Sequence, residues 1–158
     1  MNRRALLASL GVIGFSGLAG CAVFQSGDVP AGSLQFENRD DLPHVVGISV
    51  VDVGTDGGAD ADGYSVSGDV TVRPQQRELT ASSSVAPGET QTFRNIFSES
   101  VYYLVEFTID GDVPENAGRV PFNPSTRKYD NFLRGVVSAS GELSWTISTT
   151  DNAGRFEQ

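Results

Sequence analysis

Three residue types that often carry chemistry are nearly absent from this chain. Among 158 residues there is one cysteine, one histidine and one methionine. The single cysteine, Cys21, excludes an intramolecular disulfide, a multi-cysteine zinc site and a CxxC redox motif. The single histidine, His44, leaves a serine hydrolase only one possible base, and the mature chain has no Gly-x-Ser-x-Gly elbow. We therefore expect no catalytic residues and no cofactor, and predict that the protein is not an enzyme.

Lysine is also scarce, because Lys128 is the only one in the chain. Lys and Arg together number 11 against 20 Asp and Glu, which gives a formal net charge of −9. Such an acidic surface argues against nucleic acid as a partner, since phosphate binding needs a basic face. At about 1 M salt the Debye length is only about 3 Å, so repulsion among exposed carboxylates is screened. The charge predicts a protein that needs high salt to stay folded, and an ordinary acidic protein is the alternative.

Long apolar runs are lacking except near the N-terminus. Arg3 and Arg4 precede an apolar run over residues 5–20, which is followed by Cys21. This run is shorter than the roughly 20 apolar residues of a membrane-spanning helix. Its glycines cost about 1 kcal/mol each, relative to alanine, inside a helix. The pattern predicts a secretory signal peptide over residues 1–20, and an uncleaved membrane anchor is the alternative.

Two parts of this signal resemble known export motifs. Arg3-Arg4, with Leu6-Leu7 just behind, resembles a twin-arginine export signal. Leu18-Ala19-Gly20-Cys21 resembles the lipobox at which prokaryotic lipoproteins are cut before a lipid-modified cysteine. Lipidation of Cys21 would supply two hydrocarbon chains, enough for stable anchoring. With the acidic surplus, the chain resembles the twin-arginine-exported lipoproteins of haloarchaea.

This resemblance implies a location and a domain organisation. The protein would be lipid-anchored on the outer, extracellular face of the cytoplasmic membrane, with membrane lipid as a partner through Cys21 and other envelope proteins as further partners. We expect a signal peptide over residues 1–20, a lipidated cysteine and tether over 21–32, one domain over 33–150 and a flexible tail over 151–158. The tether is assigned because residues 22–32 are short and rich in turn-forming residues.

The mature chain shows no apolar pattern of helical period, and its dominant period is two. In the last expected strand Leu143, Trp145 and Ile147 alternate with polar residues. About eight short strands separated by turn signals predict an all-β fold, a single antiparallel Greek-key β-sandwich of immunoglobulin-like or cupredoxin-like form. The strands are expected within residues 34–36, 45–53, 66–72, 79–85, 90–97, 101–109, 136–139 and 143–147. The expected core comprises one face of residues 101–109 together with Leu34, Phe36, Ile48, Val50, Val70, Val72, Phe93, Leu104, Leu143, Trp145 and Ile147.

Residues 36–46 resemble the first copper-ligand region of cupredoxins, because a strand ends in Asn38 and Pro43-His44 enters the next strand. A blue-copper centre also needs a cysteine thiolate and a second histidine. This chain has no second histidine, and its only cysteine belongs to the lipobox. The resemblance therefore implies a shared architecture and no copper site. We interpret His44 as a strand-entry residue, and a functional titrating group is the alternative.

An acidic, glycine-rich segment is the only candidate metal region. Asp60, Asp62 and the following Gly63 match part of a calcium loop, and Asp56 lies just before them. Gly58 occupies the place of the first ligand and has no side-chain oxygen. A cation site at Asp56, Asp60 and Asp62 is one hypothesis, and an acidic surface loop is the other.

A basic stretch is the candidate binding loop. Arg119, Arg127, Lys128 and Arg134 fall in or near residues 116–129, the longest irregular segment expected in the domain. Long loops in compact domains tend to be functional or disordered. The alternative is a set of surface arginines paired with neighbouring acids.

A pair of adjacent tyrosines offers a candidate aromatic surface. Tyr102 and Tyr103 must point to opposite faces of the expected strand, so one is core and the other is available for stacking on a sugar or a partner. The alternative is simple packing. The sequence as a whole predicts a non-catalytic, lipid-anchored cell-surface binding or interaction module of unknown partner. The alternative is a surface binding protein for a small solute, cation or glycan.

Overall fold

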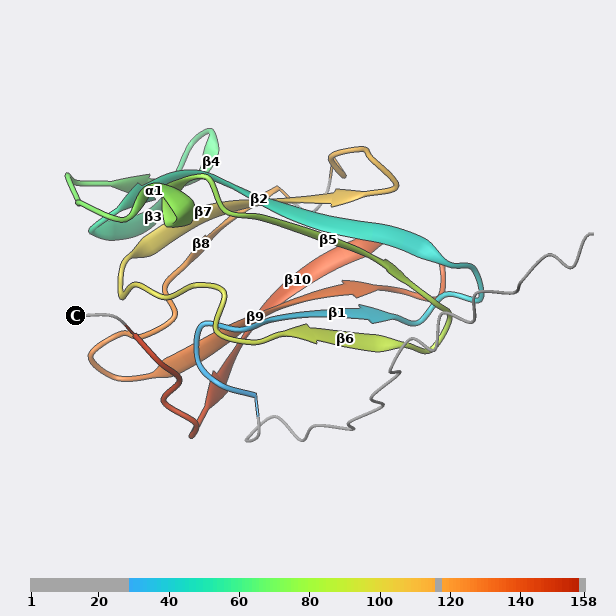
Figure 1. Ribbon diagram of the computed structural model, residues 1–158. Helices are drawn as coiled ribbons and strands as arrows, with labels where there is room; N and C mark the ends of the chain where they lie inside the picture. The colour runs from blue at the N-terminus through green and yellow to red at the C-terminus, as the bar shows by residue number, and fades with distance from the viewer. Residues whose placement is uncertain (1–28, 116–117, 157–158) are drawn as a thin grey trace, which may run out of the picture.

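A computed structural model describes residues 29–115 and 118–156 (Figure 1). These residues form ten strands and one short helix. The elements in chain order are β1 Leu34–Asn38, β2 His44–Gly54, β3 Asp56–Asp60, β4 Gly63–Ser67, α1 Pro74–Arg77, β5 Thr80–Val85, β6 Thr90–Phe93, β7 Tyr102–Ile109, β8 Arg119–Phe122, β9 Asp130–Val137 and β10 Leu143–Thr150.

Eight of the strands form two four-stranded sheets that lie over one another (Figure 1). The first sheet has the order β10-β9-β1-β6 and the second the order β5-β2-β7-β8. The predicted all-β sandwich is therefore confirmed. One pairing departs from an all-antiparallel arrangement, because β1 runs parallel to β9. Parallel pairing is possible here since the chain passes through the second sheet and returns between these two strands.

The space between the sheets is filled by apolar side chains from both. Phe36 and Leu133 of the first sheet and Val105 and Phe107 of the second are fully buried. Of the predicted core, Leu34, Phe36, Ile48, Val50, Leu104 and Leu143 are buried, and Val70, Val72, Phe93 and Trp145 are half-buried against the cluster. The prediction that Ile147 belongs to the core was wrong: its side chain is 38% exposed, in a strand at the edge of its sheet.

Strand β4 ends earlier than the sequence pattern predicted. A strand was expected over residues 66–72, but β4 stops at Ser67. Gly68 has a φ of +87°, outside the range of a strand, and the chain then leads into α1. The buried side chain of α1 is Gln76, whose Oε1 accepts a 2.7 Å hydrogen bond from the hydroxyl of Tyr103 in β7. The short helix is thus fixed to the second sheet.

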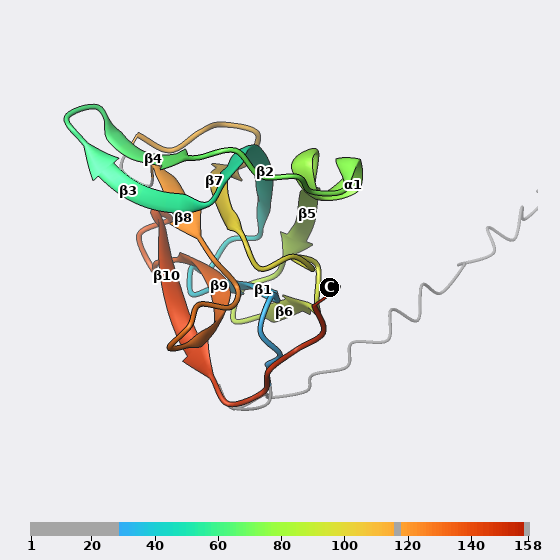
Figure 2. The same cartoon turned by 90° about the vertical axis from the view of Figure 1, so that its left-hand side faces the viewer.

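The hairpin β3–β4 lies against the outer side of β7 and β8 (Figure 2). Its close approach depends on Gly57, because a Cβ there would come within 2.5 Å of Cδ1 of Tyr102 and 3.0 Å of Pro121. A register shift between Val50 and Asp52 in β2 precedes the turn into the hairpin. Strand β3 itself is exposed along its length, so its position comes from contacts with β4, β7 and β8.

The folded region begins earlier than the sequence predicted. Val29 and Ala31 are buried, although residues 21–32 were expected to form a tether. The backbone N–H of Ala31 donates to the carbonyl of Asn152, and the hydroxyl of Thr150 donates to the carbonyl of Val29. The domain therefore extends to Val29, and part of the expected tail packs on this N-terminal segment. Among the residues that the structure describes, no helix is long and apolar enough to cross a membrane.

Candidate functional site

The only histidine is held between two carboxylates. At the start of β2, Nε2 of His44 lies 2.7 Å from Oδ2 of Asp40, and Nδ1 lies 2.7 Å from Oδ2 of Asp110. The other oxygen of Asp110 accepts the backbone N–H of Val45. The hydrogen bonds that the imidazole donates to Asp110 and Asp40 raise the pKa of His44 and lower the pKa of each carboxyl group. Because both ring nitrogens are engaged, neither is free to take a proton from a substrate or to bind a metal.

This charge cluster connects separate loops of one end of the sandwich. Asp40 lies in the β1–β2 loop and Asp110 in the turn after β7, at a positive φ of 52°. Gly141 in the β9–β10 turn is close enough that a Cβ would lie 3.1 Å from Oδ2 of Asp40. The side chains of His44 and Asp40 are 12% and 10% exposed. His44 is the first residue of β2, as the sequence indicated. Its two carboxylate partners link the β1–β2 loop to the turn after β7.

The acidic segment does not assemble into a metal site. Asp56 begins β3, whereas Asp60 and Asp62 lie at the other end of the hairpin. Oδ1 of Asp60 accepts the backbone N–H of Asp62 at 2.9 Å, which is a local turn contact. Across residues 29–115 and 118–156, no group of three His, Cys, Asp or Glu residues could hold a metal ion. Asp56 is thus separated from Asp60 and Asp62 by the length of β3.

The four basic residues do not form one patch either. Arg119 in β8 pairs with Glu106 of β7 at 3.0 Å. Arg134 lies in β9 of the first sheet, where its guanidinium donates to Oε1 of Gln35 at 2.8 Å. Arg127 and Lys128 lie in the loop between β8 and β9, and Nζ of Lys128 is 5.0 Å from the ring centroid of Tyr129. Arg134 also lies 4.0 Å from Oε2 of Glu37, so Arg119 and Arg134 match the interpretation of arginines paired with neighbouring acids. Arg127 remains available for a binding role.

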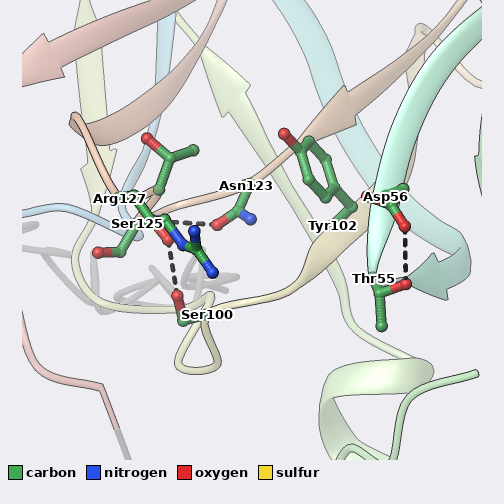
Figure 3. Close-up of a pocket in the computed structure, with 8 residues that line it drawn as sticks. Thr55, Asp56, Ser100, Tyr102, Asn123, Ser125 and Arg127 are labelled. Carbon is green, nitrogen blue, oxygen red and sulfur yellow. Dashed lines mark hydrogen bonds between the residues drawn. The ribbon is translucent and has the colours of Figure 1, made fainter. Parts of the chain in front are cut away.

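An open cavity lies where the root of the hairpin meets the ends of β7 and β8. Its volume is about 640 Å³. Figure 3 shows Thr55 and Asp56 on one wall, Asn123 and Arg127 on the opposite wall, and Tyr102 between them. The lining is formed by three separate segments, and its members are Thr55, Asp56, Ser100, Tyr102, Asn123, Ser125, Thr126 and Arg127.

Hydrogen bonds fix the wall that carries Asn123 and Arg127. The hydroxyl of Ser100 donates to the carbonyl of Ser125 at 2.6 Å, which joins the loop before β7 to the loop after β8 (Figure 3). The backbone N–H of Ser125 donates to Oδ1 of Asn123 at 3.0 Å. Nδ2 of Asn131 donates to the carbonyl of Asn123 at 3.0 Å. These hydrogen bonds therefore hold the loop between β8 and β9 in place.

The cavity has two charged residues, and they are of opposite sign. Asp56 accepts a 3.0 Å hydrogen bond from the hydroxyl of Thr55. Within the described part of the chain, neither Asp56 nor Arg127 forms an ion pair, and the guanidinium of Arg127 donates no hydrogen bond. Charged side chains that converge on one cavity without pairing are available to a ligand.

The cavity joins residues that the sequence had placed in different hypotheses. Asp56 came from the candidate cation loop, Arg127 from the candidate basic loop, and Tyr102 from the tyrosine pair. Tyr103, its neighbour, is buried, and burial raises the pKa of its hydroxyl. Sequence reasoning missed Thr55, Ser100 and Asn123, because no pattern marks a hydroxyl or amide that becomes a cavity wall only through tertiary contacts.

The predicted export and lipidation residues, Arg3, Arg4, Leu18, Ala19, Gly20 and Cys21, lie outside the described residues. A comparison with protein-family models finds no match to this chain. Comparisons with curated proteins and with solved structures find no match either.

Proposed function

We propose that this protein is a non-catalytic, lipid-anchored binding module on the outer face of the cytoplasmic membrane, and that it binds a small polar solute or saccharide. The observation that carries this proposal is the polar cavity of about 640 Å³ between the hairpin root and the β8–β9 loop. Ligand cavities usually have about 300–1,000 Å³ and a few convergent polar groups. Here the amide, hydroxyls, charges and aromatic ring come from three segments, two of which are joined by the hydrogen bond from Ser100 to Ser125.

The distribution of titrating groups supports a non-catalytic role. The carboxyl groups with displaced pKa values, Asp40 and Asp110, pair with His44 at the other end of the sandwich. Active sites are where displaced pKa values are expected to gather. Among the described residues that line the cavity, none is a histidine, cysteine or lysine that would act with Asp56 or Arg127 as a base or nucleophile.

A membrane anchor at Cys21 is supported by the lipobox-like sequence alone. The described part of the chain begins at Val29, seven residues after Ala22 in the sequence. A Cys21→Ser variant should remain in the soluble fraction after export, whereas the natural chain should sediment with membranes. An Arg3→Lys, Arg4→Lys variant should accumulate as uncleaved precursor. Sedimentation of the Cys21→Ser variant with membranes would favour an uncleaved anchor.

Binding of a solute can be tested by blocking the cavity. The purified mature lipoprotein would be screened in detergent with neutral sugars, acidic sugars and small zwitterions, with ligand-induced thermal stabilisation as the readout. An Asp56→Trp variant should lose the stabilisation because the larger side chain fills the mouth of the cavity. The matched Asp62→Trp variant, at the far end of the same hairpin, should retain it. Stabilisation that survives Asp56→Trp would place the ligand elsewhere.

Interaction with other envelope proteins is the second candidate function. Two exposed apolar residues, Leu42 and Val45, flank His44 at the entrance to β2, and they are 60% and 48% exposed. Crosslinking of the intact lipoprotein in its own membranes at high salt should then capture one recurring protein. A Val45→Asp variant should lose that product. Crosslinking that is insensitive to Val45→Asp would remove this candidate.

A further inference from the structure

The two charges in the cavity point to the chemical class of the ligand, and this step rests on the function proposed above. Asp56 and Arg127 line the same cavity and lie on opposite sides of it in Figure 3. They come from different segments and do not form an ion pair with each other or with any other described residue. We propose that the cavity binds a small zwitterion, whose ammonium group pairs with Asp56 and whose carboxylate pairs with Arg127.

The charge balance of the site favours a ligand with no net charge. The remaining lining residues are neutral, so the cavity carries one negative and one positive group. The chain around it is strongly acidic, with 20 Asp and Glu against 11 Lys and Arg, and its field disfavours a simple anion. A neutral sugar would remove water from both charged groups without pairing either of them with an opposite charge. A zwitterion satisfies both and adds no net charge.

The wall that carries Asp56 is suited to an ammonium group. Gly57, the next residue, packs against the ring of Tyr102, which places this aromatic side chain at the same wall. A cation beside a carboxylate and an aromatic ring gains from both the ion pair and the cation–π attraction.

The opposite wall is suited to a carboxylate. Oδ1 of Asn123 already accepts the backbone N–H of Ser125, so Nδ2 remains as a donor, and Figure 3 shows it on the side away from Ser125. Arg127 lines the same cavity, and its guanidinium can donate two parallel hydrogen bonds to one carboxylate. Two donor groups therefore converge where the negative end of the ligand would lie.

The distance between the ligand's charges can be measured with a graded series. We would titrate the full mature lipoprotein in detergent with glycine, β-alanine, 4-aminobutyrate and 5-aminopentanoate, using calorimetry. Butyrate, butylammonium and galactose serve as the anion, the cation and the neutral polyol. One member of the amino-acid series should bind at least about tenfold more tightly than the single-charge compounds, as expected for one added charge-assisted contact.

Matched variants identify the two charged contacts. Arg127→Gln and Asp56→Asn should each weaken binding of the best zwitterion by about tenfold or more. Lys128→Gln, the neighbouring cation outside the cavity, and Asp62→Asn, on the same hairpin, should leave the affinity unchanged. Circular dichroism of all four variants checks their folding. Comparison of Tyr102→Leu with Tyr102→Phe measures the contribution of the aromatic ring to the affinity without changing a charge.

The outcomes separate this inference from the proposed function. Binding of galactose with no preference for the zwitterions would overturn the inference and leave the solute-binding function standing. Equal binding of butyrate, or an affinity unaffected by Asp56→Asn, would also overturn it. If none of the compounds binds, both the inference and the solute-binding proposal fail, and the interaction with envelope proteins becomes the preferred function.

Discussion

Nε2 of His44 and Oδ2 of Asp40 lie 2.7 Å apart, and both side chains are largely shielded from solvent. Asp110 completes the cluster from another loop, at 2.7 Å from Nδ1. The imidazole is thus enclosed by two carboxylates, and it joins the loop between β1 and β2 to the turn after β7, which is distant in sequence.

This cluster predicts a pH dependence of stability. The pKa of His44 is raised in the folded state, so its contribution is complete below the ordinary value of about 6.5 and is lost as the pH rises through the folded value. The pKa values of Asp40 and Asp110 are lowered, so their contribution is complete above about pH 4 and is lost on acidification. Stabilisation by the cluster is therefore greatest between about pH 4 and pH 6.5.

The measurement is urea unfolding of the natural chain and of His44→Gln across that range at fixed salt. The difference in unfolding free energy between the two proteins should be largest near the middle of the range and should decline on both sides. A constant difference from acidic to alkaline pH would show that the ring acts only through packing.

The contact of the hairpin with β7 predicts an unequal response of adjacent glycines. A Cβ at Gly57 would lie 2.5 Å from Cδ1 of Tyr102, whereas a Cβ at Gly58 would meet nothing within 4 Å. Gly57→Ala should lower the unfolding free energy by about 1–3 kcal/mol through overpacking. Gly58→Ala should leave it within about 0.5 kcal/mol of the natural value or raise it slightly. Similar losses in both variants would mean that the hairpin does not lie against Tyr102.

The tyrosine pair predicts a second unequal response. The hydroxyl of Tyr103 donates to Gln76 at 2.7 Å and accepts the backbone N–H of Glu99 at 3.2 Å, so Tyr103→Phe leaves partners unsatisfied near the core. We expect a loss of about 1–3 kcal/mol in unfolding free energy. Tyr102→Phe should change stability by less than about 0.5 kcal/mol, since Tyr102 is not a core residue. Equal effects measured by urea unfolding would contradict this assignment.

The acidic composition predicts a requirement for salt. Dilution from about 1 M to about 0.01 M salt lengthens the Debye length from about 3 Å to about 30 Å and exposes the carboxylates to mutual repulsion. Far-ultraviolet circular dichroism should show loss of β structure at the low concentration and its recovery on return to high salt. A spectrum that does not change would identify an ordinary acidic protein.

The period-two pattern located β2, β7 and β10, but burial alternates only in part: Leu104 in β7 is buried beside Tyr103 and Val105, and Ile147 in β10 is exposed. Two strands were not predictable in this way. Strand β3 contains no large apolar residue, and its Gly and Asp residues disfavour strands, so tertiary contacts determine it. Strand β8 contains Pro121, which a pattern analysis treats as a break, but an edge strand tolerates it.

The candidate site was predictable only in parts. Asp56, Tyr102 and Arg127 stood out because charge and aromatic character are visible in a sequence. Their meeting in one cavity depends on a hairpin that turns back over the outer side of β7 and on a hydrogen bond between Ser100 and the loop after β8. Neither contact is visible in the hydrophobic pattern of the sequence. The sequence therefore contains no sign that the three segments form one cavity.

The entry to β1 has a mechanical consequence. The backbone N–H of Gly32, just before β1, donates to the carbonyl of Asn131, whose Nδ2 donates to the carbonyl of Asn123 in the cavity wall. If the N-terminus is anchored as proposed, a pull between it and a molecule held in the cavity would act at one end of the sandwich and pass through these contacts. The strand pairings further along both sheets would carry little of that load, so the sandwich would keep its fold while the cavity was under tension.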